Sequence, residues 1–350
     1  MPSPWGRSHC SRRSFLLGGA ALATVARRGP IAANERSPRH LVLAPSNLGL
    51  RPESSEPEPG TWRAPAVLMA AGLQQRVAAE RVIQLSRPPY DARPQPGTRV
   101  RNGNTLRHFS LALATAVQAS LAADAFPLVI GGDCSVLLGS LYGARLAGAR
   151  GLVHIDGHSD FFHPGNYDTR SRLGSAAGMD LALATGRGEP LLTRWPDVDG
   201  PLVRDEDAVQ LGDREALDDN SRAYYRDLAR TSITRYIIQD VLETGVEHCA
   251  RSVIDRLKAR QLTRVWLHVD LDVLDQSSMP AVDSPGSPGL TFTQLGTLIS
   301  RLYRSRRVAG ATITIYDPAR DPDNRYAAPI VATLGAAFTW SADDDPMDNT

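Results

Sequence analysis

Three short polar motifs contain the residue types that hold divalent metal ions. They are Gly131-Gly132-Asp133-Cys134-Ser135, Asp156-Gly157-His158-Ser159-Asp160 and Asp270-Leu271-Asp272-Val273-Leu274-Asp275. Residues at positions i, i+2 and i+4 of an extended segment point to the same side, so Asp156, His158 and Asp160 are predicted to converge. Asp270 and Asp272 share a side by the same rule.

These carboxylates need a compensating positive charge if they are buried. Burying several carboxylates is very unfavourable unless their charge is neutralised, and no lysine or arginine lies within the three motifs. Aspartate and histidine together suit manganese, iron or zinc. Two such ions that share carboxylates can activate water near neutral pH. The motifs therefore predict a two-metal hydrolytic centre.

Short apolar segments precede the motifs and are predicted to be strands that position them. The expected strands are residues 41–44, 82–85, 127–130, 151–155, 235–238, 264–269 and 312–316, and helical spacing is expected at 66–80, 105–123 and 136–146. Short strands that alternate with helices indicate a three-layer α/β/α fold with a mostly parallel sheet. Ligands bind at the carboxyl ends of such strands, which is where the motifs fall.

Length and composition fit one soluble α/β domain. The chain has 350 residues, of which 42% are hydrophobic, and no linker divides it. The formal net charge is only +1, and no basic stripe alternates with aromatic residues. Nucleic-acid binding is therefore not expected.

The N-terminus is typical of a twin-arginine export signal. The segment Ser11-Arg12-Arg13-Ser14-Phe15-Leu16-Leu17 precedes an apolar stretch, 18–26, that is too short to span a membrane. Cleavage could follow Ala26 or Ala33. We expect a signal at 1–33, a single catalytic domain at 34–350, periplasmic or secreted localisation, and no membrane attachment after the signal is removed. The alternative is a plain arginine-containing tail.

The order of the three motifs resembles the arginase/agmatinase (ureohydrolase) family. The resemblance extends over residues 40–340 and includes Pro285-Gly286 and Gly289-Leu290-Thr291 after the third motif. It implies the fold shared by arginases and deacetylases, although the motifs fit ureohydrolases better than deacetylases. It also implies two manganese ions that activate water for attack on a guanidinium carbon, with release of urea. Relatives commonly form trimers or hexamers, so a homo-oligomer is expected.

Carried over by motif, the resemblance implies two ligand sets that share Asp156 and Asp270. The first ion would be held by Cys134, Asp156, Asp160 and Asp270, and the second by Asp156, His158, Asp270 and Asp272. Asp160 is also assigned a catalytic role. Asp133 and Asp275 are expected to support their loops by hydrogen bonds.

Cys134 occupies the position where the family's first-metal histidine is usual. A thiolate prefers zinc or iron(II) to manganese, so manganese is the first expectation and zinc or iron the alternatives. Cys134 could instead be a small buried residue. It could also form a disulfide with Cys249 in an oxidising compartment.

The residues that recognise the substrate differ from the family pattern. Ile315 occupies the position of the guanidinium-binding glutamate, and an apolar side chain cannot pair with a cation. Three neighbours could substitute for it, namely Tyr316, Asp317 and Asp321. Asp240 could receive a substrate amine or could be an ordinary turn residue. Leu242 replaces a second aspartate of the same segment.

The family's acid/base histidine has no counterpart, because Ala177 occupies its position in Gly174-Ser175-Ala176-Ala177-Gly178-Met179. His163 could transfer protons instead, or it could be a loop residue without a role. We therefore expect a metal-dependent hydrolase of C–N bonds in linear guanidines or amidines, with a small-molecule substrate other than L-arginine. The alternative is an exported ligand-binding pseudoenzyme that keeps the fold and a metal site.

Overall fold

The computed structural model describes residues 37–52, 58–215 and 222–339. These described residues all belong to one compact unit. The expected export signal at 1–33 lies outside the described residues and stays a prediction. Among the helices that the structure describes, none has the length and apolar character needed to span a membrane.

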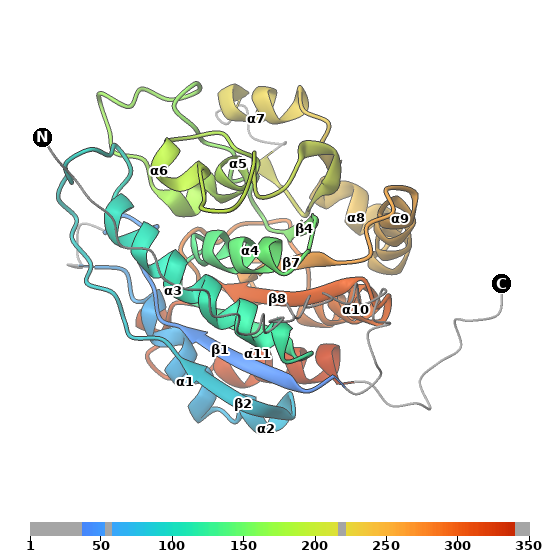
Figure 1. Cartoon of the computed structure of the whole chain (residues 1–350). Coiled ribbons are helices and arrows are strands. Elements are labelled where there is room, and N and C mark those ends of the chain that lie inside the picture. Colours follow the sequence, from blue (N-terminus) through green and yellow to red (C-terminus); the bar gives the residue numbers. More distant parts are fainter. Residues whose placement is uncertain (1–36, 53–57, 216–221, 340–350) are drawn as a thin grey trace, which may run out of the picture. The chain divides into compact units, whose positions relative to one another are not determined.

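The described chain forms an eight-stranded sheet in which every pair of neighbouring strands is parallel (Figure 1). The strand order is β2-β1-β3-β8-β7-β4-β5-β6. The strands are β1 Arg39–Ala44, β2 Ala79–Gln84, β3 Phe126–Gly131, β4 Gly151–Ile155, β5 Ala208–Leu211, β6 Thr234–Tyr236, β7 Val265–Asp270 and β8 Val308–Thr314.

Helices cover both faces of the sheet, which confirms the three-layer α/β/α prediction. One face packs against α3 Gly103–Ala122, α4 Val136–Leu146, α5 Asp180–Ala184, α6 Pro190–Thr193 and α7 Arg222–Ala229. The other packs against α1 Ala64–Ala70, α2 Leu73–Arg76, α8 Ile238–Thr244, α9 Val246–Ala259, α10 Phe292–Arg304 and α11 Ala327–Phe338. Parallel strands require such helical crossovers.

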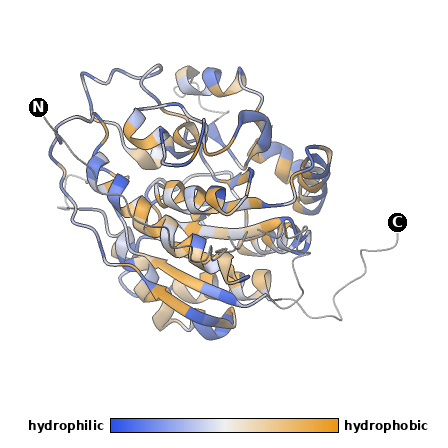
Figure 2. Ribbon diagram, in the orientation of Figure 1, coloured by the Kyte–Doolittle hydropathy of each residue, from blue (hydrophilic) through white to orange (hydrophobic). Residues whose placement is uncertain are grey.

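Successive strand residues supply the two hydrophobic cores in turn. Leu152 packs on the face that carries α3 and α4, whereas Val153 packs on the opposite face. This alternation follows from the two-residue period of a strand. Figure 2 shows hydrophobic residues along β1 and β2, with hydrophilic residues concentrated on the outer parts of the helices.

The predicted helix at 66–80 was too long. The structure contains α1 and α2 with a break at Gly72, whose φ of 88° lies in the left-handed region that glycine adopts without strain. The chain then enters β2 at Ala79, at an edge of the sheet. A left-handed glycine is a common helix terminator, and the apolar spacing alone did not reveal it.

Several strand boundaries also differ from the prediction, and the strand expected at 82–85 is β2, which begins at Ala79. The strand expected at 235–238 is β6, which ends at Tyr236, and Ile238 instead begins α8. The strand expected at 312–316 is β8, which ends at Thr314. The strand β5 was not predicted, because Ala208–Leu211 has only four residues and includes Gln210.

Candidate metal centre

The polar motifs meet at the carboxyl edge of the sheet. Cys134 follows β3, Asp156 follows β4 directly, and Asp270 is the last residue of β7. β4 pairs with β7, and Ile155 lies opposite Val269. Asp156 and Asp270 therefore leave neighbouring strands at the same level, which places their carboxylates close together.

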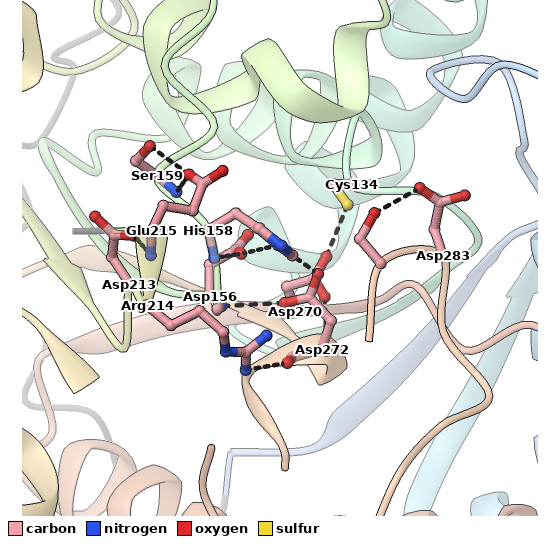
Figure 3. Close-up of polar contacts among 12 residues, drawn as sticks. Cys134, Asp156, His158, Ser159, Asp213, Arg214, Glu215, Asp270, Asp272 and Asp283 are labelled. Carbon is pink, nitrogen blue, oxygen red and sulfur yellow. Dashed lines mark hydrogen bonds and ion pairs between the residues drawn. The ribbon is translucent and has the colours of Figure 1, made fainter. Parts of the chain in front are cut away.

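Direct contacts join the side chains of this cluster (Figure 3). The thiol Sγ of Cys134 lies 2.7 Å from Oδ2 of Asp270, to which it donates. Nδ1 of His158 lies 2.8 Å from Oδ2 of Asp272. Asp156, His158 and Asp272 each offer one ligand atom, and these atoms lie within 4.8 Å of one another. The structure thus brings together residues from all three motifs.

The backbone of Asp156, His158 and Asp160 forms a short turn and is not extended, so the expected extended arrangement was wrong. The carboxylate of Asp156 accepts a hydrogen bond from the backbone N–H of His158 at 2.7 Å. Asp160 has a φ of 43°, in the left-handed region that is uncommon for residues other than glycine. In the third motif, the carboxylate of Asp270 accepts from the N–H of Asp272 at 2.8 Å.

Hydrogen bonds within and around the Gly-Gly-Asp turn hold its backbone in place. The Asp133 carboxylate accepts hydrogen bonds from the hydroxyl of Ser46 at 2.8 Å and from the N–H of Gly49 at 3.1 Å. A Cβ on Gly132 would lie 1.7 Å from the carbonyl oxygen of Ser46, so only glycine fits at that position. This turn fixes the backbone that carries Cys134.

Burial and mutual repulsion dominate the electrostatics of the cluster. Burial raises the pKa of Asp156, Asp160 and Asp270, and neighbouring carboxylates raise each pKa further. Burial also raises the pKa of Asp272, but His158 outweighs that effect and the pKa of Asp272 is lowered overall. Burial lowers the pKa of His158, whereas Asp272 raises it to about 9. Bound cations would neutralise these closely spaced buried carboxylates and remove their mutual repulsion.

The donor set fits divalent transition metals. Carboxylate oxygens and an imidazole nitrogen suit manganese, iron and zinc. Oδ2 of the fully buried Asp156 has no hydrogen-bond partner among the described residues, which leaves an acceptor position for a cation. The three motifs therefore form a candidate metal centre.

The two described cysteines are separate free thiols, so the disulfide alternative was wrong. Cys249 lies in α9, where its Sγ is 3.2 Å from the hydroxyl of Thr244. Burial, followed by the charge of Asp270, raises the pKa of Cys134 well above its usual value. In the metal-free protein this side chain is therefore a thiol and not a thiolate.

The residues proposed to recognise the substrate lie apart from these contacts. Asp240 is an exposed residue of α8. Tyr316 is buried and donates from its hydroxyl to Asp321 at 2.7 Å. The Asp317 carboxylate accepts from the N–H groups of Gly60 and Ala319. The hydrogen bonds of Tyr316, Asp317 and Asp321 hold loops in place. Roles of these residues and of Asp240 in substrate recognition stay predictions.

Ile315 has a strained backbone beside the centre. Its φ of 74° is a genuine outlier for a β-branched residue, and its side chain is only 1% exposed. Its N–H donates to the carbonyl of Gly132 at 2.7 Å. The segment after β8 is thereby held against the Gly-Gly-Asp turn, with an apolar side chain in the position of the expected glutamate.

His163 lies in the loop after the second motif and faces α7. Its Nε2 is 3.3 Å from Oδ2 of Asp227, and its Nδ1 accepts from the N–H of Gly165 at 3.1 Å. Ala177 is buried, and its N–H donates to the carbonyl of Gly49. The position of the missing acid/base histidine is therefore filled by a small apolar side chain.

A group of supporting residues after β5 was not predicted from the sequence. The carboxylate of Glu215 accepts from the N–H and the hydroxyl of Ser159 at 2.9 and 2.8 Å. The guanidinium of Arg214 donates to the carbonyl of Asp272 and, at 3.0 Å, to that of Pro288. A charged run, Asp213-Arg214-Glu215, directly after an unrecognised strand was the available signal. Together, the parallel sheet and the acidic cluster at its carboxyl edge define a metal-binding α/β protein.

Comparison with known proteins identifies the family. A family model described as Arginase family matches residues 42–342. An arginase from Bacillus caldovelox is 31% identical over 245 residues, which cover 70% of this chain and 79% of that protein. The chain therefore belongs to the arginase family, as the motifs predicted.

Solved structures agree with the fold. The native arginase from Bacillus caldovelox superposes with a TM-score of 0.74 at 26% identity, covering 88% of this chain and 100% of that chain. Formimidoylglutamase from Bacillus subtilis superposes with a TM-score of 0.64 at 20% identity, covering 87% and 88% of the two chains. The family supports metal-dependent hydrolysis of guanidino C–N bonds as the general activity.

Proposed function

We propose that this protein is a binuclear metal-dependent hydrolase that cleaves C–N bonds of linear guanidino or amidino compounds other than L-arginine. The meeting of Asp156, His158, Asp270 and Asp272 at one edge of the sheet carries the proposal. Manganese is the first candidate metal, with zinc and iron as alternatives because of the Cys134 thiol. Family membership supports the reaction type.

A bound pair of divalent ions would supply activated water at neutral pH. The chain's own residues position that water and the substrate. Asp160 is buried beside the cluster, and we assign its carboxylate to accept the proton that the water loses. Arg214 and Glu215 hold the backbone around Asp272 and Ser159, which keeps the ligands in place.

The substrate class follows from the residues that differ from the family pattern. An apolar Ile315 offers no charge to a guanidinium group, and Leu242 is 37% exposed where a second aspartate is usual. Recognition of the α-amino and guanidinium groups of L-arginine in the usual way is therefore not supported. We therefore propose a guanidino or amidino compound other than L-arginine as the substrate.

A panel of guanidino and formimino compounds tests this proposal. The protein is loaded with manganese or zinc, and release of urea, ammonia or amine is measured with each compound. We expect turnover of at least one compound and much weaker turnover of L-arginine. Silence across the panel at full metal occupancy would support the ligand-binding pseudoenzyme, which the apolar Ile315 and Ala177 favour.

We also propose that His163 transfers protons during turnover, with Asp227 orienting its ring. Replacing His163 by alanine is then expected to lower kcat on the order of 10²-fold and to change the pH–rate profile. Replacing His108, an exposed histidine of α3, is the matched control and should leave kcat unchanged. An unaltered kcat and pH profile in His163→Ala would assign His163 to the loop alone.

We propose that the twin-arginine motif exports the folded protein to the periplasm or medium. Export of a folded chain would let the protein take up its metal in the cytoplasm. Replacing Arg12 and Arg13 by lysine tests this, because unchanged export would count against the motif. Formation of a homo-oligomer also stays a prediction.

A further inference from the structure

Two histidines and an aspartate are buried next to the motif carboxylates, on the side toward the interior of the sheet. His154 belongs to β4, two residues before Asp156, and His268 belongs to β7, two residues before Asp270. Asp180 is the first residue of α5. His154, His268 and Asp180 are each 0% exposed. Burial of three ionisable side chains is uncommon unless they are paired or bind a metal.

The contacts among these groups are incomplete. Nε2 of His154 is hydrogen-bonded to Oδ1 of Asp180 at 3.1 Å and lies 3.7 Å from Oδ2 of Asp156. Nε2 of His268 lies 3.6 Å from Oδ2 of Asp180. Among the described residues, Oδ2 of Asp156, Oδ2 of Asp180 and both ring nitrogens of His268 have no hydrogen-bond partner. Buried polar atoms without partners are rare in native proteins.

The same distances suit donors that share one metal ion. Two ligands bound tetrahedrally to one ion at about 2.1 Å each lie about 3.4 Å apart. The separations of 3.1 and 3.7 Å from Nε2 of His154 lie on either side of that value. One ligand atom each from His154, Asp160 and Asp180 also lie within 4.8 Å of one another. His154 is common to the Asp156 contact and to the group with Asp160 and Asp180, so these four side chains surround one position.

The two imidazoles cannot both bind that ion in the observed arrangement. Their rings stack at a centroid distance of 4.9 Å with an interplanar angle of 20°. The nitrogen lone pairs lie in the ring planes, and those of nearly parallel rings do not converge. His268 instead faces the carboxylate of Asp180. A ring N–H of His268 can orient this carboxylate toward the ion without binding the ion itself.

We propose that His154, Asp156, Asp160 and Asp180 hold the first metal ion, with His268 positioning Asp180. Cys134 is then not a ligand, and its thiol donates to Asp270. This inference rests on the proposed metal-dependent function. The set contains one imidazole and three carboxylates, which is the composition that the family resemblance implies for the first ion. His154 thereby supplies the histidine that the Cys134 position lacks.

Metal content of matched variants tests the assignment. Wild type, Asp180→Asn, Cys134→Ala and the control Asp207→Asn are saturated with manganese, freed of excess metal and analysed for metal per chain. Asp207 is a buried aspartate before the first residue of β5, at the opposite edge of the sheet, where it binds Arg260. We expect two ions in wild type, Cys134→Ala and Asp207→Asn, and one ion in Asp180→Asn.

The opposite pattern, with one ion in Cys134→Ala and two in Asp180→Asn, would overturn the assignment and leave the two-metal hydrolase intact. A wild type that binds no ion would overturn the metal-dependent function itself. If Asp180→Asn does not fold, anomalous diffraction from wild-type crystals at the manganese edge decides. A peak within bonding distance of Nε2 of His154 supports the proposal, and a peak bonded to Sγ of Cys134 refutes it.

Discussion

Replacing Asp270 by asparagine is expected to abolish hydrolysis, with kcat/KM falling on the order of 10³-fold or more. Asp270 is fully buried and lies at the meeting point of the motifs. Asparagine keeps the shape of the side chain but removes the negative charge that a metal ligand at this position would supply. Steady-state turnover and metal content of the variant measure this effect.

The melting temperature of the Asp270→Asn variant distinguishes loss of activity at the centre from misfolding. Burial and the neighbouring Asp272 raise the pKa of Asp270, so its charge is unfavourable in the metal-free fold. Metal-free Asp270→Asn is therefore expected to melt at the same temperature as metal-free wild type or higher. Asp275→Asn is the matched control from the same motif, because its carboxylate binds Ser277, and it should retain activity. An active, metal-replete Asp270→Asn would contradict the proposed centre.

Removing divalent metal is expected to lower the melting temperature of wild type by roughly 10 °C. An ion present at about 1,000 times its Kd stabilises the native state by about 4 kcal/mol. For a domain of this size, each kcal/mol corresponds to roughly 2–4 °C. The ions also relieve repulsion among buried carboxylates whose pKa values are raised by burial and by one another.

Scanning calorimetry before and after chelation measures this shift, with elemental analysis to verify removal. Adding back manganese or zinc should restore the melting temperature, whereas sodium chloride of equal ionic strength should not. A melting temperature that does not change on complete metal removal would show that the cluster is stable without cations.

The sequence predicted the layers and the motif carboxylates because both follow from short-range patterns. Largely apolar strands such as β4, Gly151–Ile155, alternate with helices, and the polar motifs follow them. The break at Gly72 and the early end of β6 were missed because apolar spacing alone does not locate a helix or strand end. The four-residue β5 was too short to be recognised.

The residues beneath the centre were harder to predict. Asp180 belongs to no motif and comes from a short helix, α5, far from the strands in sequence. His154 looks like a strand residue, and only its position beside Asp180 gives it chemical meaning. Their proximity depends on how helices dock on the sheet, which a residue pattern along one strand does not encode.

The position of β8 has a consequence for incomplete genes. β1, β2 and β3 pair among themselves, as do β4, β5, β6 and β7, and β8 alone pairs with both β3 and β7 among the described strands. A premature stop codon just before Val308 would delete none of the motif residues. It would nevertheless remove the strand that sets Cys134 beside Asp270. A gene fragment with every motif intact is therefore no evidence of an intact centre.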